Sequence, residues 1–219
     1  LGNGGAEKLV VELSNELGLK NNVTIVSLKK VEDWMFPPSQ ISSKVKLIEL
    51  NKKKGFDFYV LHSLYSLLKK EQPQIVHIHL RLSLYYFLLL IPFFKKINFY
   101  FTIHATFDQH QVLFNRLEKL PFYRKVTNIC LSETIYNEFN KAFPKLNFTT
   151  IENGVKAMKP TKLNDNVKEQ VNSKRINGNN KVFLFVGRLS YSKNIPLMLD
   201  VFSDMSLNYS TLIIIGSGP

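Results

Sequence analysis

Three histidines stand at the ends of short apolar segments, where they could do chemistry. His77 and His79 close the run at residues 75–79, and His104 closes the run at 99–104. Alternate residues of a strand share a face, so His77 and His79 could form half of a metal site, but no cysteine or suitably spaced carboxylate completes it. We therefore predict no metal site. His104 has two interpretations, a ligand-binding imidazole or a structural one bonded to a neighbouring loop.

Two cations follow a later apolar run, at residues 182–186. Gly187 and Arg188 leave this run, and Lys193 comes five residues after Arg188, just before a predicted helix at 196–205. Backbone N–H groups at a helix N-terminus, together with two cations on one loop, can form a clamp for a diphosphate. A solvated loop that binds nothing is the alternative.

Two glycine-rich loops could approach a phosphate closely. Gly4 and Gly5 come just before the first predicted helix, and Gly216 and Gly218 follow the last predicted strand. Backbone N–H groups at such positions can receive a phosphate. The first loop is not a dinucleotide-binding fingerprint, because Glu7 replaces its last glycine. A tight loop without a ligand is an equally good interpretation.

The elements that must position these residues alternate between strands and helices. Such alternation indicates an α/β protein with parallel sheets covered on both faces, in which ligands bind beyond the carboxyl ends of the strands. We expect helices at 6–17, 56–70, 133–142 and 196–205, with a short one near 166–174. The expected strands are residues 23–28, 45–50, 75–79, 99–104, 128–132, 148–152, 182–187 and 211–216.

A change in composition divides the chain. Residues 155–180 are rich in lysine and asparagine and contain no long apolar run. They indicate an exposed connection between two domains, which we place at 1–152 and 153–219. The longest apolar stretch, residues 82–94, is shorter than the ~20 residues of a membrane span, so we expect a buried helix there.

Charge and composition restrict the class of protein. Hydrophobic residues make up 45% of the chain, which argues against disorder. The net charge of +12 is compatible with nucleic acid, an anionic membrane or anionic small molecules as partners. No nucleic-acid motif appears, so no nucleic-acid partner is predicted. A dinucleotide-dependent oxidoreductase is disfavoured because Lys29 and Lys30, rather than an acidic residue, follow the expected strand at 23–28. The lone Cys130 lies in an apolar run and indicates an inert thiol in a reducing compartment.

Taken together, these loops resemble the family-4 retaining glycosyltransferases of the GT-B fold, over almost the whole chain. The resemblance implies two Rossmann-like, doubly wound domains, the second incomplete here. It also implies sugar transfer with retained configuration from a UDP- or GDP-type donor to a glycan or lipid-linked acceptor, with no cofactor and no obligatory metal. The matching stretches are residues 4–7, 75–79, 102–104, 151–155, 186–189, 192–194 and 215–219.

The resemblance also suggests a role for each candidate residue. Arg188 and Lys193 would hold the donor diphosphate and stabilise charge on the leaving group, and His104 would line the sugar pocket. His79 would help to shape the acceptor side. The loops close to the donor would be formed by Gly4, Gly5, Gly187, Gly216 and Gly218.

Two departures from the family lead to further expectations. The family has a strand before the first glycine loop, and it has a pair of donor-binding glutamates in a segment that would follow Pro219. We therefore expect an inactive fragment of an active enzyme; the alternative is a non-catalytic nucleotide-binding or scaffold remnant. Family membership also suggests polysaccharide or glycolipid synthesis in the cytoplasm, peripherally on the inner face of a membrane. Residues 93–96 and 107–124 are the candidates for contact with anionic lipid, although a core helix end explains the first stretch equally well.

Overall fold

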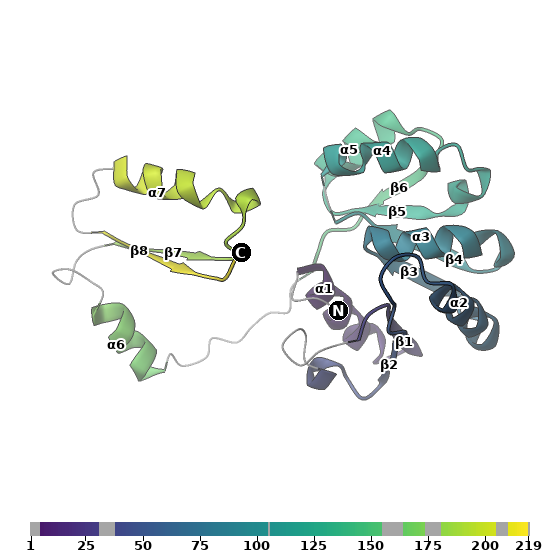
Figure 1. Cartoon of the computed structure of the whole chain (residues 1–219), viewed down its shortest axis with the longest axis horizontal. Coiled ribbons are helices and arrows are strands. Elements are labelled where there is room, and N and C mark those ends of the chain that lie inside the picture. The colour runs from purple at the N-terminus through teal and green to yellow at the C-terminus, as the bar shows by residue number, and fades with distance from the viewer. Residues whose placement is uncertain are drawn as a thin grey trace. The chain divides into compact units, whose positions relative to one another are not determined.

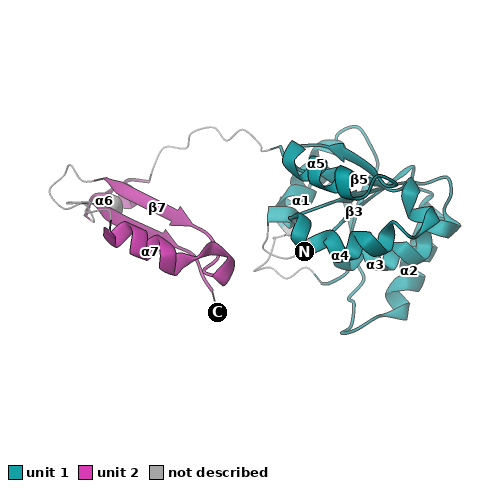
Figure 2. Cartoon of the chain, turned by 90° about the horizontal axis from the view of Figure 1, so that it is seen from above, with its two compact units in different colours: residues 1–156 teal, residues 157–219 magenta. Residues whose placement is uncertain are grey.

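Helices and strands alternate along the chain, and every strand pairing in the described residues is parallel. A computed structural model describes residues 5–30, 38–104, 106–154, 164–173, 181–204 and 210–218. The chain divides into two compact units, residues 1–156 and 157–219 (Figure 2). The fold is thus the predicted α/β class, with the Rossmann-like alternation of the GT-B architecture.

The first unit contains a two-stranded sheet, β1–β2, and a four-stranded sheet of order β3–β4–β5–β6. Short 3-10 helices, η1 to η3, lie between the main elements. The elements are α1 (Gly5–Leu17), β1 (Val23–Ser27), η1 (Pro38–Gln40), β2 (Val45–Glu49), α2 (Phe58–Glu71), β3 (Ile75–His79), α3 (Arg81–Leu90), η2 (Ile91–Phe93), β4 (Asn98–Thr102), α4 (Phe107–Leu117), η3 (Pro121–Lys125), β5 (Thr127–Cys130), α5 (Glu133–Ala142) and β6 (Asn147–Thr150).

Helices cover both faces of the β1–β2 sheet. Val11 of α1 packs on Ile25 and Val45, which belong to the two strands. Val26 and Ile48 lie at the next positions of the alternation and pack instead in the cluster that contains the buried side of α2. Successive residues of a strand point to opposite faces of the sheet, and both strands carry apolar side chains on both faces. Each face can therefore pack against a helix.

The largest core lies between the four-stranded sheet and helices α3, α4 and α5 (Figure 1). Phe101 of β4, Phe114 of α4 and Phe139 of α5 are each at most 1% exposed. The rings of Phe114 and Phe139 meet edge to face, with centroids 4.8 Å apart. Tyr123 and Asn128 add a buried polar contact, because the tyrosine hydroxyl donates to Asn128 Oδ1 over 2.7 Å.

Two expectations about helices need correction. The apolar stretch 82–94 forms α3 and η2 as predicted, but it is buried on one side only: Leu89 is 49% exposed and Phe93 is 72% exposed. Helix α4 was not predicted, although Phe107, Phe114 and Leu117 have helical spacing, seven and three residues apart. Its polar residues hide that periodicity.

The second unit pairs two strands and places helix α7 against them. Phe183 of β7 meets Phe202 of α7 edge to face, at a centroid distance of 5.7 Å. The helix begins at Ile195, as predicted within one residue, but Asn194 is left-handed with φ 45° instead of extended like a typical N-cap. The elements are α6 (Asp165–Ser173), β7 (Val182–Val186), the 3-10 helix η4 (Tyr191–Lys193), α7 (Ile195–Asp204) and β8 (Thr211–Ile215).

Candidate active site

A cluster of histidines lies at the carboxyl ends of β3 and β4. His79 is level with Thr102 in the parallel pairing of the two strands, and His104 follows two residues later. His77 Nε2 lies 2.7 Å from Thr102 Oγ1, and His79 Nδ1 lies 3.1 Å from His104 Nε2. Ile78 points into the core beneath α3, α4 and α5, so its neighbours His77 and His79 project from the opposite face of the sheet.

Burial keeps these imidazoles neutral at pH 7. Loss of solvation, with a smaller effect of His104, lowers the pKa of His77 to about 4. Loss of solvation, followed by the effects of His77 and His104, lowers the pKa of His79 to about 3. The pKa of His104 is lowered mainly by burial, while the charge of Glu7 opposes that shift and His110 adds to it.

The contact between His79 and His104 joins two neutral rings. Each neutral imidazole has one N–H donor and one bare nitrogen acceptor. The 3.1 Å contact between His79 Nδ1 and His104 Nε2 therefore has one donor and one acceptor, and the tautomer of one ring determines that of the other. As a result, His79 controls whether the remaining nitrogen of His104 offers a proton or a lone pair.

The chain leaves the histidine strand through a strained residue. Leu80 has φ 66° and ψ 141°, a conformation that glycine adopts freely and leucine does not. Strained backbone of this kind concentrates at functional sites and persists where the surrounding structure holds it. Here it turns the chain directly from His79 into Arg81, the first residue of α3.

The first glycine loop can be placed in part. Gly4 lies outside the described residues, and Gly5 is the first residue of α1. A Cβ at Gly5 would meet nothing within 4 Å, so open space adjoins the start of this helix. Glu7, in the first turn of α1, acts electrostatically on His104. The first turn of α1 therefore lies near the histidine cluster.

In the second unit, the loops after β7 and β8 are held against each other. The N–H of Gly187 donates to Ile215 O over 3.0 Å, and the N–H of Leu189 donates to Ser217 O over 2.9 Å. A Cβ at Gly216 would overlap the carbonyl oxygen of Gly187, and one at Gly218 would overlap that of Leu189. These two glycines are therefore required by the close approach of the loops.

Arg188 and Lys193 lie on the first of these loops, between β7 and α7. Both are exposed, and neither forms an ion pair with a carboxylate of the described residues. The loop between them is kept compact by a hydrogen bond from the Lys193 N–H to Ser190 O, 2.9 Å long. Two available cations thus project from a loop whose backbone is fixed by its neighbour.

The predicted site residues fall into two groups. His79 and His104 come together in the first unit, and Gly187, Arg188, Lys193, Gly216 and Gly218 share one pair of loops in the second. No group of three histidine, cysteine or carboxylate side chains is arranged to hold a metal among the residues that the structure describes. The sequence alone predicted no role for Thr102 or Glu7, although the matching stretches 102–104 and 4–7 contain them.

Comparison with known proteins assigns the family. The sequence profile of Glycosyltransferase Family 4 matches residues 3–158, which is more than half of the chain. The chain belongs to this family. The matched segment covers almost all of the first unit, including the glycine loop and the histidine cluster. No curated protein sequence matches the chain.

A solved structure has a similar fold. The crystal structure of a glycosyltransferase from Rickettsia africae ESF-5 is similar to this chain, with a TM-score of 0.73 and 16% sequence identity. The similarity covers 97% of this chain and 57% of the Rickettsia africae protein, so the chain spans little more than half the length of that protein. At such low identity the likeness shows the fold alone.

Proposed function

We propose that the chain is part of a retaining glycosyltransferase that moves a sugar from a UDP- or GDP-type donor to a glycan or lipid-linked acceptor. The observation that carries this proposal is the loop with Arg188 and Lys193. It presents two exposed cations at the carboxyl end of a parallel strand, where α/β proteins bind their ligands. Membership of Glycosyltransferase Family 4 supports the choice of a sugar diphosphate over other anions.

The cations would act on the charge that develops during transfer. When the bond between the sugar and the phosphate breaks, the electron pair stays with the diphosphate. Arg188 and Lys193 would stabilise that negative charge, which is greater in the transition state than in the bound donor. The leaving phosphate would take the proton of the acceptor hydroxyl, so that transfer with retention requires no separate side-chain base.

His104 would orient the donor sugar as a neutral ring. Its lowered pKa leaves it uncharged, so it can hydrogen-bond a sugar hydroxyl without bringing a positive charge to the sugar pocket. His79 would act through His104, by fixing its tautomer, and would border the acceptor side. Open space at Gly5 would allow the donor to approach the start of α1.

The wider assignment rests on membership of the family. Residues 1–152 would form the acceptor-side domain and 153–219 the start of the donor domain. The reaction would belong to cell-surface polysaccharide or glycolipid synthesis, in the cytoplasm, with peripheral contact to an anionic membrane. Within the described residues, no helix is both long enough and apolar enough to cross a bilayer.

Calorimetric titration with UDP and GDP tests the proposal. Arg188→Ala should weaken binding of the preferred nucleotide by about 10- to 100-fold, because a hydrogen bond to a charged group contributes about 1.5–3 kcal/mol. Lys181→Ala is the matched control, since Lys181 is an exposed cation at the other end of β7. Equal affinity in the wild type and Arg188→Ala would contradict the clamp.

A transfer assay separates the proposed function from the alternative one. A chain that binds the nucleotide through Arg188, yet belongs to a full-length protein without sugar transfer, is a nucleotide-binding or scaffold remnant. Transfer assays on the full-length protein with UDP- and GDP-sugars distinguish the two, and Arg188→Ala should abolish transfer if the enzyme assignment is right.

A further inference from the structure

Helix α3 exposes apolar side chains in a row. Leu82, Tyr85 and Leu89 are 43%, 44% and 49% exposed, and their spacing of three and four residues puts them on one side of the helix. Phe93, in the following turn η2, is 72% exposed. A helix that faces water normally carries charged or polar residues at such positions. This row therefore indicates a surface that meets something other than water.

The charge of the same region has one dominant sign. Residues 72–107 contain no aspartate or glutamate, and residues 72–126 contain only Asp108 and Glu118. Helices α3 and α4, with η2 and η3, account for most of this stretch. An anionic partner matches this balance far better than a neutral or cationic one. The basic side chains here are Arg81, Lys95, Lys96, Arg116, Lys119, Arg124 and Lys125.

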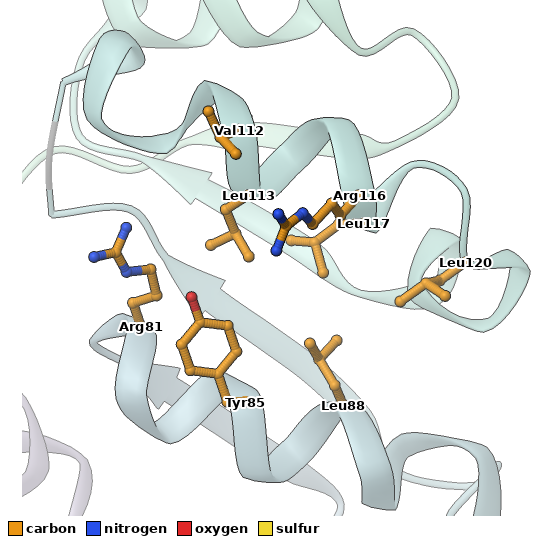
Figure 3. A pocket seen from close by; sticks show the side chains of 8 residues that line it. All are labelled: Arg81, Tyr85, Leu88, Val112, Leu113, Arg116, Leu117 and Leu120. Carbon is orange, nitrogen blue, oxygen red and sulfur yellow. The ribbon is translucent and has the colours of Figure 1, made fainter. Parts of the chain in front are cut away.

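A groove between α3 and α4 combines both properties. Arg81 and Tyr85 project into it from α3, and Arg116 projects into it from α4 (Figure 3). Leu113 and Leu117 are buried beneath and form its apolar floor. Its volume is about 190 Å³, and neither arginine forms an ion pair with a carboxylate of the described residues.

We propose that this α3–α4 groove binds the phosphate-bearing headgroup of an anionic membrane lipid. A guanidinium presents a planar fork of donors that fits phosphate oxygens, and Arg81 and Arg116 offer two of them. Tyr85 supplies an amphipathic ring of the kind found at membrane interfaces. The leucine floor accepts the first apolar part of the lipid, while Leu89 and Phe93 insert among neighbouring acyl chains.

The position of the groove connects it with the candidate active site. Arg81 follows His79 after one residue, the strained Leu80. A lipid phosphate held by Arg81 would therefore lie beside the edge of the sheet that carries the histidines. The inference rests on the membrane contact of the proposed function and gives that contact a site.

Flotation of the full chain with lipid vesicles tests the inference. Vesicles of phosphatidylcholine alone are compared with vesicles that contain 30% phosphatidylglycerol. We expect binding only to the anionic vesicles, and about 30-fold weaker binding for Arg81→Gln/Arg116→Gln, since each cation near an anionic surface contributes roughly fivefold. The matched control is Lys20→Gln/Lys44→Gln, which removes two exposed positive charges near α1 and β2.

Further variants separate the apolar and phosphate contributions. Leu89→Ser/Phe93→Ser should weaken vesicle binding with only a small loss of stability, because about half of the Leu89 side chain and most of the Phe93 side chain are exposed. Arg81→Lys/Arg116→Lys keeps the charge but loses the planar fork, so it should restore part of the binding only. Equal binding by the glutamine pair and its control would overturn the inference.

Two other results would also overturn it. One is failure of the wild type to bind anionic vesicles. The other is self-association of the chain, seen by light scattering, that Arg81→Gln/Arg116→Gln abolishes while vesicle binding persists. The diphosphate clamp is tested separately, because it predicts that nucleotide binding depends on Arg188 in the second unit. A chain that binds vesicles but not nucleotide keeps the lipid site and loses the clamp.

Discussion

The two units of the chain hold their candidate site residues in different ways. In the first unit, His77 and His79 lie on a strand whose other face packs against a buried aromatic core. Every buried apolar side chain of the described residues lies between Val11 and Leu146, all within this unit. In the second unit, Arg188 lies on a loop fixed by backbone hydrogen bonds, while Leu184 of the neighbouring strand is 62% exposed.

The difference separates two tasks in the proposed reaction. Hydrogen-bonded histidine tautomers require side chains fixed to within tenths of an ångström, which close packing provides. A clamp made of long cationic side chains tolerates more movement, since charge attraction changes slowly with distance. Under the proposed function, the histidines that would orient the sugar lie on the packed unit, and the cations that would bind the diphosphate lie on the open one.

Core truncation should show the largest contrast between the units. Phe114→Ala removes a ring that is 0% exposed and should lower the free energy of unfolding by about 3–5 kcal/mol. The matched change Leu184→Ala, on the exposed side of β7, should cost less than about 1 kcal/mol. Urea denaturation of the full chain, followed by circular dichroism, measures both. Similar losses in the two variants would mean that the second unit is packed as tightly as the first.

Much of this architecture could be predicted from the sequence. Strand β3 and helix α5 match their expected ranges to the residue, because β-branched and apolar periodicity is strong there. The partners of the histidines could not be predicted in the same way. The contact between His77 and Thr102 depends on the register of two strands that lie 25 positions apart, and long-range packing sets that register.

The same reasoning explains which site features the sequence left open. The apolar pattern at residues 82–94 predicts a helix, but the elements that pack against α3 determine which side of it is buried. Glu7 was considered merely as a departure from a glycine motif, whereas folding brings its charge close to His104. The cation loop was easier to recognise, because Arg188 and Lys193 are close in sequence and need no distant partner.

A pH series should give an effect that is confined to the first unit. Because the folded pKa values of His77 and His79 lie below the ordinary value of 6.5, only the unfolded chain takes up these protons as the pH falls. Stability should therefore be unaffected above pH 7 and should fall as the pH drops from 6.5 towards 4. Each histidine contributes a slope of at most about 1.4 kcal/mol per pH unit.

Substitution of one histidine separates its contribution to the pH dependence of stability from the contribution of the carboxyl groups. His79→Asn should reduce the slope between pH 6.5 and 4 by up to one proton, measured by urea denaturation at several pH values. His62→Asn is the control, since His62 lies on the exposed side of α2, outside the histidine cluster. If both variants behave alike, the histidine cluster is not shielded from solvent as described.

The smallest expected effect concerns backbone strain, which also differs between the units. The second unit has Asn194 at φ 45°, and asparagine tolerates this conformation. The first unit has Leu80 at φ 66°, which costs about 1–3 kcal/mol for a residue with a Cβ. Leu80→Gly relieves that strain but loses the partly buried side chain and adds backbone entropy to the unfolded state.

Comparison with Leu80→Ala removes the side-chain contribution from this measurement. Both variants lose the leucine contacts, but only alanine keeps the Cβ that is strained at positive φ. Leu80→Gly should therefore be more stable than Leu80→Ala by about 1 kcal/mol in urea denaturation. Greater stability of the alanine variant would mean that the turn from His79 to Arg81 is not strained in solution.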